Sequence, residues 1–104
     1  MSDPKIYFTL LVYLKKGQRD MFHSYENKVL PLLPAYNGTL EFRIQTDKKE
    51  DDTEVPDEVH VISFTNMKDF EDYRNDGERK RHQEMFHQSV EKAMLIPGRD
   101  IKNK

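Results

Sequence analysis

The sequence predicts an α+β domain whose four-stranded antiparallel sheet is covered by helices on one face only. Three observations lead to this fold class. A long apolar strand opens the chain, two amphipathic helical stretches separate the strand-like segments, and an acidic hairpin joins the middle two strands. The predicted elements therefore follow the order β α β β α β.

The first strand is predicted at residues 6–14, which read IYFTLLVYL. The run is β-branched, aromatic and aliphatic without Gly or Pro, and this composition is typical of a central strand that is buried on both faces. Its side chains alternate between two sets, which are Ile6, Phe8, Leu10, Val12 and Leu14 on one face and Tyr7, Thr9, Leu11 and Tyr13 on the other.

An amphipathic helix is predicted over residues 18–34, after Gly17 ends the strand. Apolar residues recur there at three- and four-residue steps, at Phe22, Tyr25, Val29 and Leu32. We expect Pro31 to kink or end this helix, because proline removes a backbone donor and crowds the preceding turn.

A second strand over residues 39–46 follows the turn signal Asn37-Gly38. Its alternation predicts Leu40, Phe42 and Ile44 on one face and Glu41, Arg43 and Gln45 on the other. Residues 47–58 hold seven acids and two lysines, which favours a solvated hairpin loop. The third strand is predicted at 59–64.

The second helical region is predicted to begin at an N-cap of Thr65 or Asn66. The segment 75–77, Asn-Asp-Gly, interrupts it, and the helix restarts near Glu78. A short last strand is expected at about 93–101.

Right-handed crossovers arrange this element order as a ferredoxin-like split βαβ pair, and 104 residues suffice for one domain that spans 1–104. Helices can cover one face of the sheet, which leaves Tyr7, Leu11 and Tyr13 uncovered. Exposing such side chains forgoes about 1.5–3 kcal/mol each, and contiguous apolar patches mark contact surfaces. We therefore predict a homodimer packed sheet to sheet. The alternative is a half-exposed face whose tyrosine hydroxyls meet water.

Composition argues against several classes of partner. The formal net charge of -2 gives no general attraction to nucleic acid, and the aromatic, basic strand of RNA-recognition domains is missing. No long apolar run predicts a membrane span, and the absence of cysteine is typical of a cytoplasmic protein. No phosphate loop, nucleophile elbow or zinc signature is present, so we expect no metal site and no cofactor.

Four residues are the candidates for a site. Arg43 was expected in the cavity between the sheet and the partner subunit, where its guanidinium would clamp a carboxylate or enolate. His60 would act there as a general base, although both alternating sets of its strand are apolar and leave its facing open. Tyr7 and Tyr13 would orient a ligand through their hydroxyls. The alternatives are a rim ion pair for Arg43, a structural histidine, and aromatic packing at the dimer interface.

Other polar residues favour a structural reading. His82 and His87 are five apart and cannot share a metal ion, while His23 and Glu26 share a helix face without a third ligand and are interpreted as solvated surface residues. The basic run 79–81 alternates with acids and is interpreted as a salt-bridged helix face.

Two longer segments carry a resemblance to a known family. They are VLPLLPAYNGTLEFR and PDEVHVISFTNMKDFEDYRND. The first segment has a helix that ends in a Tyr-x-Gly turn before an arginine-bearing strand. The second has a strand that ends in Phe before a Phe-x-x-Tyr helix. Together these two patterns resemble the dimeric α+β barrel superfamily. This superfamily includes antibiotic-biosynthesis monooxygenases, EthD-like and NIPSNAP-like proteins and small bacterial proteins of unknown function. The matching positions are Tyr36, Gly38, Arg43, Phe64, Phe70 and Tyr73.

The resemblance implies a dimeric ferredoxin-like domain that binds a small organic or anionic molecule in the cleft between sheet and partner. It also implies cofactor-independent oxygenase or isomerase chemistry, although no tryptophan and no matching Asn, Trp and His set support the monooxygenase branch. The alternative is a non-catalytic dimer that binds a metabolite or serves a regulatory or structural role, so catalysis stays an open question at this point.

Overall fold

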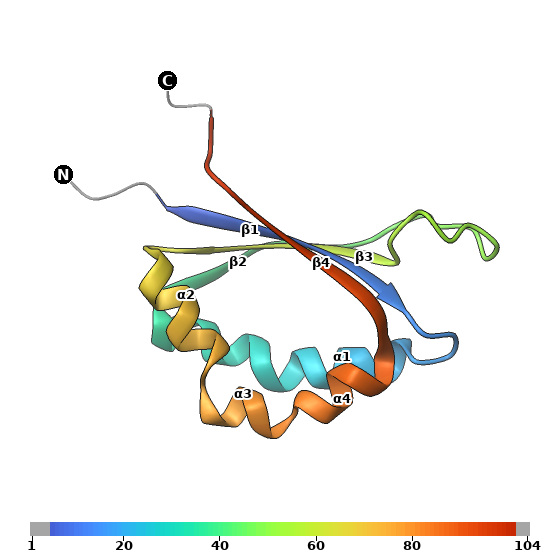
Figure 1. Cartoon of the computed structure of the whole chain (residues 1–104), viewed down its shortest axis with the longest axis horizontal. Coiled ribbons are helices and arrows are strands. Elements are labelled where there is room, and N and C mark those ends of the chain that lie inside the picture. Colours follow the sequence, from blue (N-terminus) through green and yellow to red (C-terminus); the bar gives the residue numbers. More distant parts are fainter. Residues whose placement is uncertain (1–4, 102–104) are drawn as a thin grey trace.

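The computed structural model describes residues 5–101, and it has the predicted order of elements with helices on one face of the sheet (Figure 1). The strands are β1 (Ile6–Leu14), β2 (Gly38–Gln45), β3 (Glu58–Phe64) and β4 (Val90–Gly98), and the helices are α1 (Arg19–Val29), the 3-10 helix η1 (Leu30–Tyr36), α2 (Met67–Arg74), α3 (Gly77–Arg81) and α4 (Gln83–Ser89). The sheet order is β2-β3-β1-β4, with antiparallel pairing throughout. The predicted ferredoxin-like fold and the central position of the first strand are confirmed.

Local sequence signals explain where the helices end. Pro31 lies at the start of η1, so the predicted helix changes at Leu30 from α to 3-10 geometry. Asn37 then takes a left-handed conformation with a φ of 57° and turns the chain into β2. Asn66 caps α2, because its side chain accepts a hydrogen bond of 2.9 Å from the backbone N–H of Asp69.

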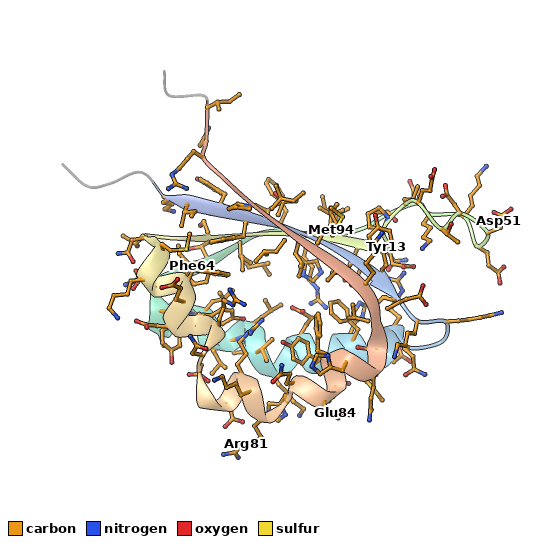
Figure 2. The ribbon with its side chains drawn as sticks, in the orientation of Figure 1. Tyr13, Asp51, Phe64, Arg81, Glu84 and Met94 are labelled. Atoms are coloured by element: carbon orange, nitrogen blue, oxygen red, sulfur yellow. The ribbon has the colours of Figure 1, made fainter. Side chains whose placement is uncertain are left out.

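Two clusters of buried side chains form the core between the sheet and the helices. One contains Ile6, Phe8, Leu33, Phe64, Phe70 and Tyr73, and the other contains Val12, Phe22, Tyr25, Val29 and Val90. Figure 2 shows Phe64 between the sheet and the helical layer, while Arg81 extends from that layer away from the sheet. The face of β1 that meets the helices therefore carries Ile6, Phe8 and Val12, as the alternation of the sequence predicted.

A β-bulge in β2 changes which residues face the helices. The pairing with β3 shifts between Leu40 and Phe42, and beyond the shift Phe42 pairs with Val61 and Arg43 with His60. His60 also pairs with Leu10 of the inner set of β1, so Arg43 and His60 lie on the helix-covered face. The expectation that Arg43 faces a partner subunit across the open face was wrong, because the extra residue reverses the alternation after Leu40.

The face of the sheet opposite the helices is apolar and uncovered, and we call it the open face. Its side chains are Tyr7, Thr9, Leu11, Tyr13, Phe42, Ile44, Val59, Val61, Met94 and Ile96. Phe42 is 61% exposed and Ile44 50%. The predicted uncovered face is thus present, and the bulge enlarges it with two side chains of β2. Within residues 5–101, no helix is long and apolar enough to cross a membrane.

Candidate functional site

A charged cluster lies under the sheet around Glu58, which is only 2% exposed at the start of β3. We call its members the Glu58 cluster: Glu58, Arg19, His23, His60 and Arg43. The Glu58 carboxylate accepts hydrogen bonds from Arg19 Nη1 at 2.7 Å and pairs with His23 Nε2 at 2.6 Å and His60 Nε2 at 2.9 Å. The register of β2 and β3 brings Arg43 beside His60, and α1 supplies Arg19 and His23 from the helical layer.

The cluster holds Glu58 in its charged form. Burial alone would raise the pKa of Glu58, but hydrogen bonds from His60 and His23 outweigh it and lower the pKa to about 2. Glu26 of α1 has the opposite balance: it is 4% exposed, and burial raises its pKa against the opposing charges of His60, Arg43 and Arg79. His60 Nδ1 lies 3.8 Å from Glu26 Oε2, so His60 stands between two carboxyl groups whose pKa values are shifted in opposite directions.

Arg43 reaches the edge of this cluster at a pocket of about 260 Å³, which we call the Arg43 pocket. It is lined by His23, Asn27, Arg43, Gln45 and Glu58. The only ion pair of the Arg43 guanidinium within residues 5–101 is a long one, 4.0 Å from Nε to Glu58 Oε1, and it donates no hydrogen bond there. Arg43 therefore has donors to spare for a ligand.

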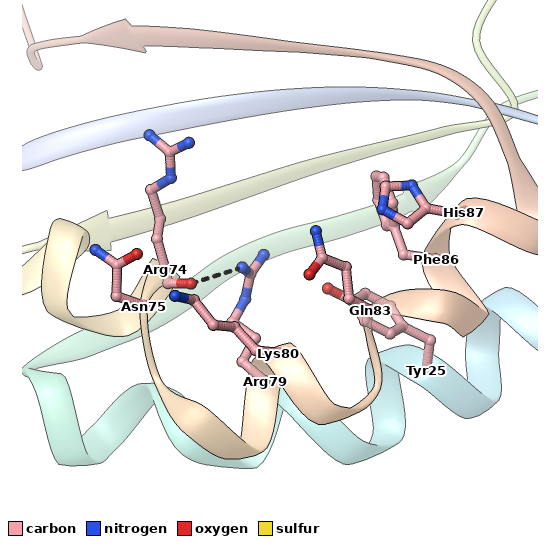
Figure 3. A pocket seen from close by; sticks show the side chains of 8 residues that line it. All are labelled: Tyr25, Arg74, Asn75, Arg79, Lys80, Gln83, Phe86 and His87. Atoms are coloured by element: carbon pink, nitrogen blue, oxygen red, sulfur yellow. Dashed lines mark hydrogen bonds between the residues drawn. The ribbon is translucent and has the colours of Figure 1, made fainter.

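A second pocket, of about 270 Å³, lies on the other side of α1, and we call it the Arg79 pocket (Figure 3). Its lining comes from α1, from the end of α2, and from α3 and α4, and consists of Tyr25, Arg74, Asn75, Arg79, Lys80, Gln83, Phe86 and His87. The rings of Tyr25 and Phe86 pack 5.5 Å apart at 57° and form an aromatic wall.

Arg79 is held in this pocket by its surroundings. Its guanidinium lies 4.9 Å above the Tyr73 ring, and its Nη1 donates to the Arg74 carbonyl at 3.5 Å. Its Nε is buried without a hydrogen-bond partner, the one such side-chain atom within residues 5–101. Burial raises the pKa of Tyr73 to about 12 although Arg79 opposes it, so this tyrosine stays neutral beside the guanidinium.

The Arg79 pocket carries an excess of positive charge. Arg74, Arg79 and Lys80 line it, no carboxylate does, and none of the three forms an ion pair within 4 Å among the described residues. Our interpretation of residues 79–81 as a salt-bridged face holds for Arg81, which pairs with Glu78 at 3.7 Å, but it was wrong for Arg79 and Lys80. All three residues belong to α3, where Arg79 is half-buried and Lys80 and Arg81 are exposed.

The two candidate tyrosines lie on the open face, away from Arg43 and His60. Tyr7 and Tyr13 are both half-buried there, and the Tyr13 hydroxyl donates to the Glu54 carbonyl at 3.2 Å. Lys92 and Lys48 lie 4.6 and 5.7 Å from the centre of the Tyr13 ring. The structure thus brings Arg43 and His60 together and keeps the tyrosines apart from them.

Several residues of these pockets were missed by sequence reasoning. The interpretation of His23 and Glu26 as solvated surface was wrong for Glu26, which is 4% exposed, and it missed the pairing of His23 with Glu58, which is distant in sequence. Arg74 and Arg79 could be recognised only once the positions of α2 and α3 were known. Within the described part of the chain, no group of three His, Cys, Asp or Glu side chains could hold a metal ion.

Solved structures share this fold at low sequence identity. A protein of unknown function from Rhodopseudomonas palustris matches with a TM-score of 0.81 and 16% identity, covering 95% of this chain and 84% of its own. A dimeric ferredoxin-like protein of unknown function from Jannaschia sp. CCS1 matches with a TM-score of 0.75 and 14% identity, covering 92% and 99%. A NIPSNAP family protein of unknown function from Agrobacterium tumefaciens matches with a TM-score of 0.71 and 14% identity, covering 97% and 92%.

These likenesses agree with the superfamily that the sequence resembles, and at such identities they establish the fold. No protein-family model and no curated protein matches the sequence. The function therefore has to be inferred from the pockets and the open face of this chain.

Proposed function

We propose that this protein is a homodimer that binds a small organic anion with a flat apolar body in the Arg79 pocket. One observation carries the proposal: Arg74, Arg79 and Lys80 line a pocket that no carboxylate lines. Arg79 is half-buried, whereas Arg74 and Lys80 are exposed, and an unpaired buried donor such as Arg79 Nε calls for a partner that binds from outside the chain.

The pocket walls indicate the kind of anion. An arginine donates in a planar fork that matches a carboxylate or phosphate, and two cations nearby add attraction at long range. Tyr25 and Phe86 offer ring surface for an apolar or aromatic body. A volume of about 270 Å³ corresponds to roughly nine water-sized volumes, which suits an acid of benzoate size.

Binding of benzoate and phenyl phosphate, measured by titration calorimetry, tests this proposal, with neutral benzyl alcohol as the uncharged comparison. We expect the acids to bind and the alcohol not to bind. Loss of a charged hydrogen-bond donor is worth about 1.5–3 kcal/mol, so Arg79→Gln should weaken binding by about tenfold or more.

Arg81→Gln is the matched control. It removes the same positive charge two residues after Arg79, from a side chain that does not line the pocket and that pairs with Glu78. We expect it to keep wild-type affinity. Equal weakening by both variants would mean unspecific attraction to basic residues, and the absence of binding by either acid would contradict the proposal.

The homodimer is supported by the open face. Phe42, Ile44, Met94 and Ile96 are 45–61% exposed on one apolar surface, too large a set of side chains to leave in water without a contact role. The chain from Jannaschia is described as dimeric, and the same is said of a ferredoxin-like protein from Bacteroides fragilis. Sheet-to-sheet packing of two copies would bury this surface in a closed two-fold assembly.

Sedimentation equilibrium at micromolar concentration checks the assembly. Wild type should sediment as a dimer, and Phe42→Glu should sediment as a folded monomer because a charge would replace an apolar side chain of the proposed interface. Met67→Glu, at a residue 44% exposed on α2, is the control and should stay dimeric. A wild-type monomer, or a Phe42→Glu dimer, would contradict the proposed interface.

A further inference from the structure

Three members of the Glu58 cluster, His23, Arg43 and Glu58, line the Arg43 pocket. This pocket therefore contains a carboxylate, which the Arg79 pocket lacks. His23 and Asn27 face one side of α1, whereas Tyr25 of the Arg79 pocket lies about 200° around the helix from His23. The two pockets are therefore separate. What the Arg43 pocket can do depends on the groups that remain available in it.

His23 has one ring nitrogen engaged and one available. Its Nε2 pairs with Glu58 at 2.6 Å, which fixes the orientation of the imidazole, and no hydrogen bond to its Nδ1 is present within residues 5–101. Glu58 stays charged well below neutral pH, since its pKa is about 2. A histidine that donates one N–H to a charged carboxylate presents its other nitrogen as a proton acceptor.

Arg43 supplies a positive charge on the other side of the same carboxylate. Arg19, which also pairs with Asp57 at 3.6 Å, lies 2.7 Å from Glu58, whereas Arg43 lies 4.0 Å from it and donates no hydrogen bond to it. Its guanidinium hydrogens have no acceptor in the described chain and line the Arg43 pocket. An oxyanion in this pocket would therefore meet a fork of donors in a position fixed by β2.

A larger apolar pocket adjoins the Arg43 pocket, because Asn27 lines both. It measures about 550 Å³, its apolar lining comes from η1 and β2 and includes Leu30, Leu33 and Leu40, and Glu26 of α1 lines it beside Asn27. A ligand with an acidic end at Arg43 has room for a branched hydrocarbon tail along this groove. A positive charge at one end and apolar surface at the other suit a small aliphatic acid.

We propose that the Arg43 pocket catalyses keto–enol proton transfer on aliphatic 2-oxo acids. His23 Nδ1 takes a proton from the carbon next to the ketone, and the electron pair of the broken C–H bond forms the C=C bond while the ketone oxygen becomes the enolate. The Arg43 guanidinium pairs with the carboxylate and with the developing enolate oxygen. Return of a proton from His23 to carbon or to oxygen completes the reaction without any co-reactant. His23 and Arg43 are the catalytic residues, and Glu58 is a positioning residue.

Exchange of the C3 protons of 4-methyl-2-oxopentanoate in D₂O, followed by proton NMR at neutral pH, tests the proposal. Wild type should accelerate the exchange above the buffer rate, and pyruvate, which lacks the branched tail, should show a higher KM. General base catalysis contributes about 10²–10⁴-fold, so His23→Gln should lose about a hundredfold or more in kcat. Arg43→Gln should lose activity while keeping the fold, because its side chain lies at the pocket mouth.

His82→Gln is the matched control, since His82 pairs with Glu78 on the far side of the helical layer and should leave the exchange unchanged. If His23→Gln fails to fold, the result with Arg43→Gln decides. Exchange at the buffer rate with both oxo acids, or wild-type exchange in folded His23→Gln or Arg43→Gln, would overturn the proposal.

Discussion

Replacement of Glu58 by Gln tests whether the charged cluster stabilises the fold. The pKa of Glu58 is about 2 against an ordinary 4.5, and one unit corresponds to about 1.4 kcal/mol, so its ionised form contributes about 3 kcal/mol at neutral pH. The folded pKa is the lower one, so this contribution is complete above pH 4.5 and is lost as the pH falls toward 2. Glu58→Gln should therefore lower the free energy of unfolding by about 3 kcal/mol at pH 7 and by about half of that at pH 3.

Urea denaturation at pH 7, 4 and 3 measures these differences, at one fixed protein concentration because a dimer is more stable when concentrated. Glu84→Gln is the control, since Glu84 is an exposed acid and its loss should change stability little at any pH. A loss for Glu58→Gln that is the same at pH 7 and pH 3 would mean that it reflects packing and not the charge, and the reasoning would be refuted.

Two further substitutions test single features of the fold. Glu26→Gln should raise Tm relative to wild type, and the difference should grow as the pH rises above 4.5. The reason is that burial raises the pKa of Glu26, so ionisation of this carboxyl group destabilises the folded wild type. A Tm difference that is the same at pH 4 and pH 8 would contradict this. Gly38→Ala should lower the free energy of unfolding by about 1–3 kcal/mol, because the added Cβ would lie 2.7 Å from Phe64 Cε1 and 2.8 Å from Leu33 Cδ2. Gly98→Ala is the control, since its added Cβ would meet no atom within 4 Å, and it should be nearly neutral in the same urea titration.

The fold was predictable because each element carries its own local signal. The alternation in β1 assigned its two faces correctly, and Pro31 marked the change from α1 to η1. The last strand began earlier than expected, at Val90, because α4 ends at Ser89 and the chain enters the sheet at once. Boundaries of this kind depend on tertiary contacts that a local pattern does not contain.

The site was less predictable, because it depends on pairing between distant segments. One extra residue at the bulge after Leu40 moved Arg43 from the open face to the inner face, and no residue type in β2 announces such a bulge. The facing of His60 was open because both sides of β3 are apolar in sequence, and only its pairing with Leu10 settles it. His23 and Glu58 are 35 residues apart, so their contact could not be inferred from spacing.

The two faces of the sheet differ in the chemistry that they can support, and the difference follows from what covers them. On the inner face, helices exclude water around Glu58 and Glu26, so charges interact strongly and the pKa values of the two acids move in opposite directions. On the open face, Tyr7, Thr9 and Tyr13 bring hydroxyl groups into a surface of aliphatic and aromatic side chains, and the Tyr13 hydroxyl donates a hydrogen bond to the Glu54 carbonyl. Titratable groups with shifted pKa values beside pockets mark the inner face as the place for ligand chemistry. The open face offers exposed apolar area, which suits the proposed second subunit.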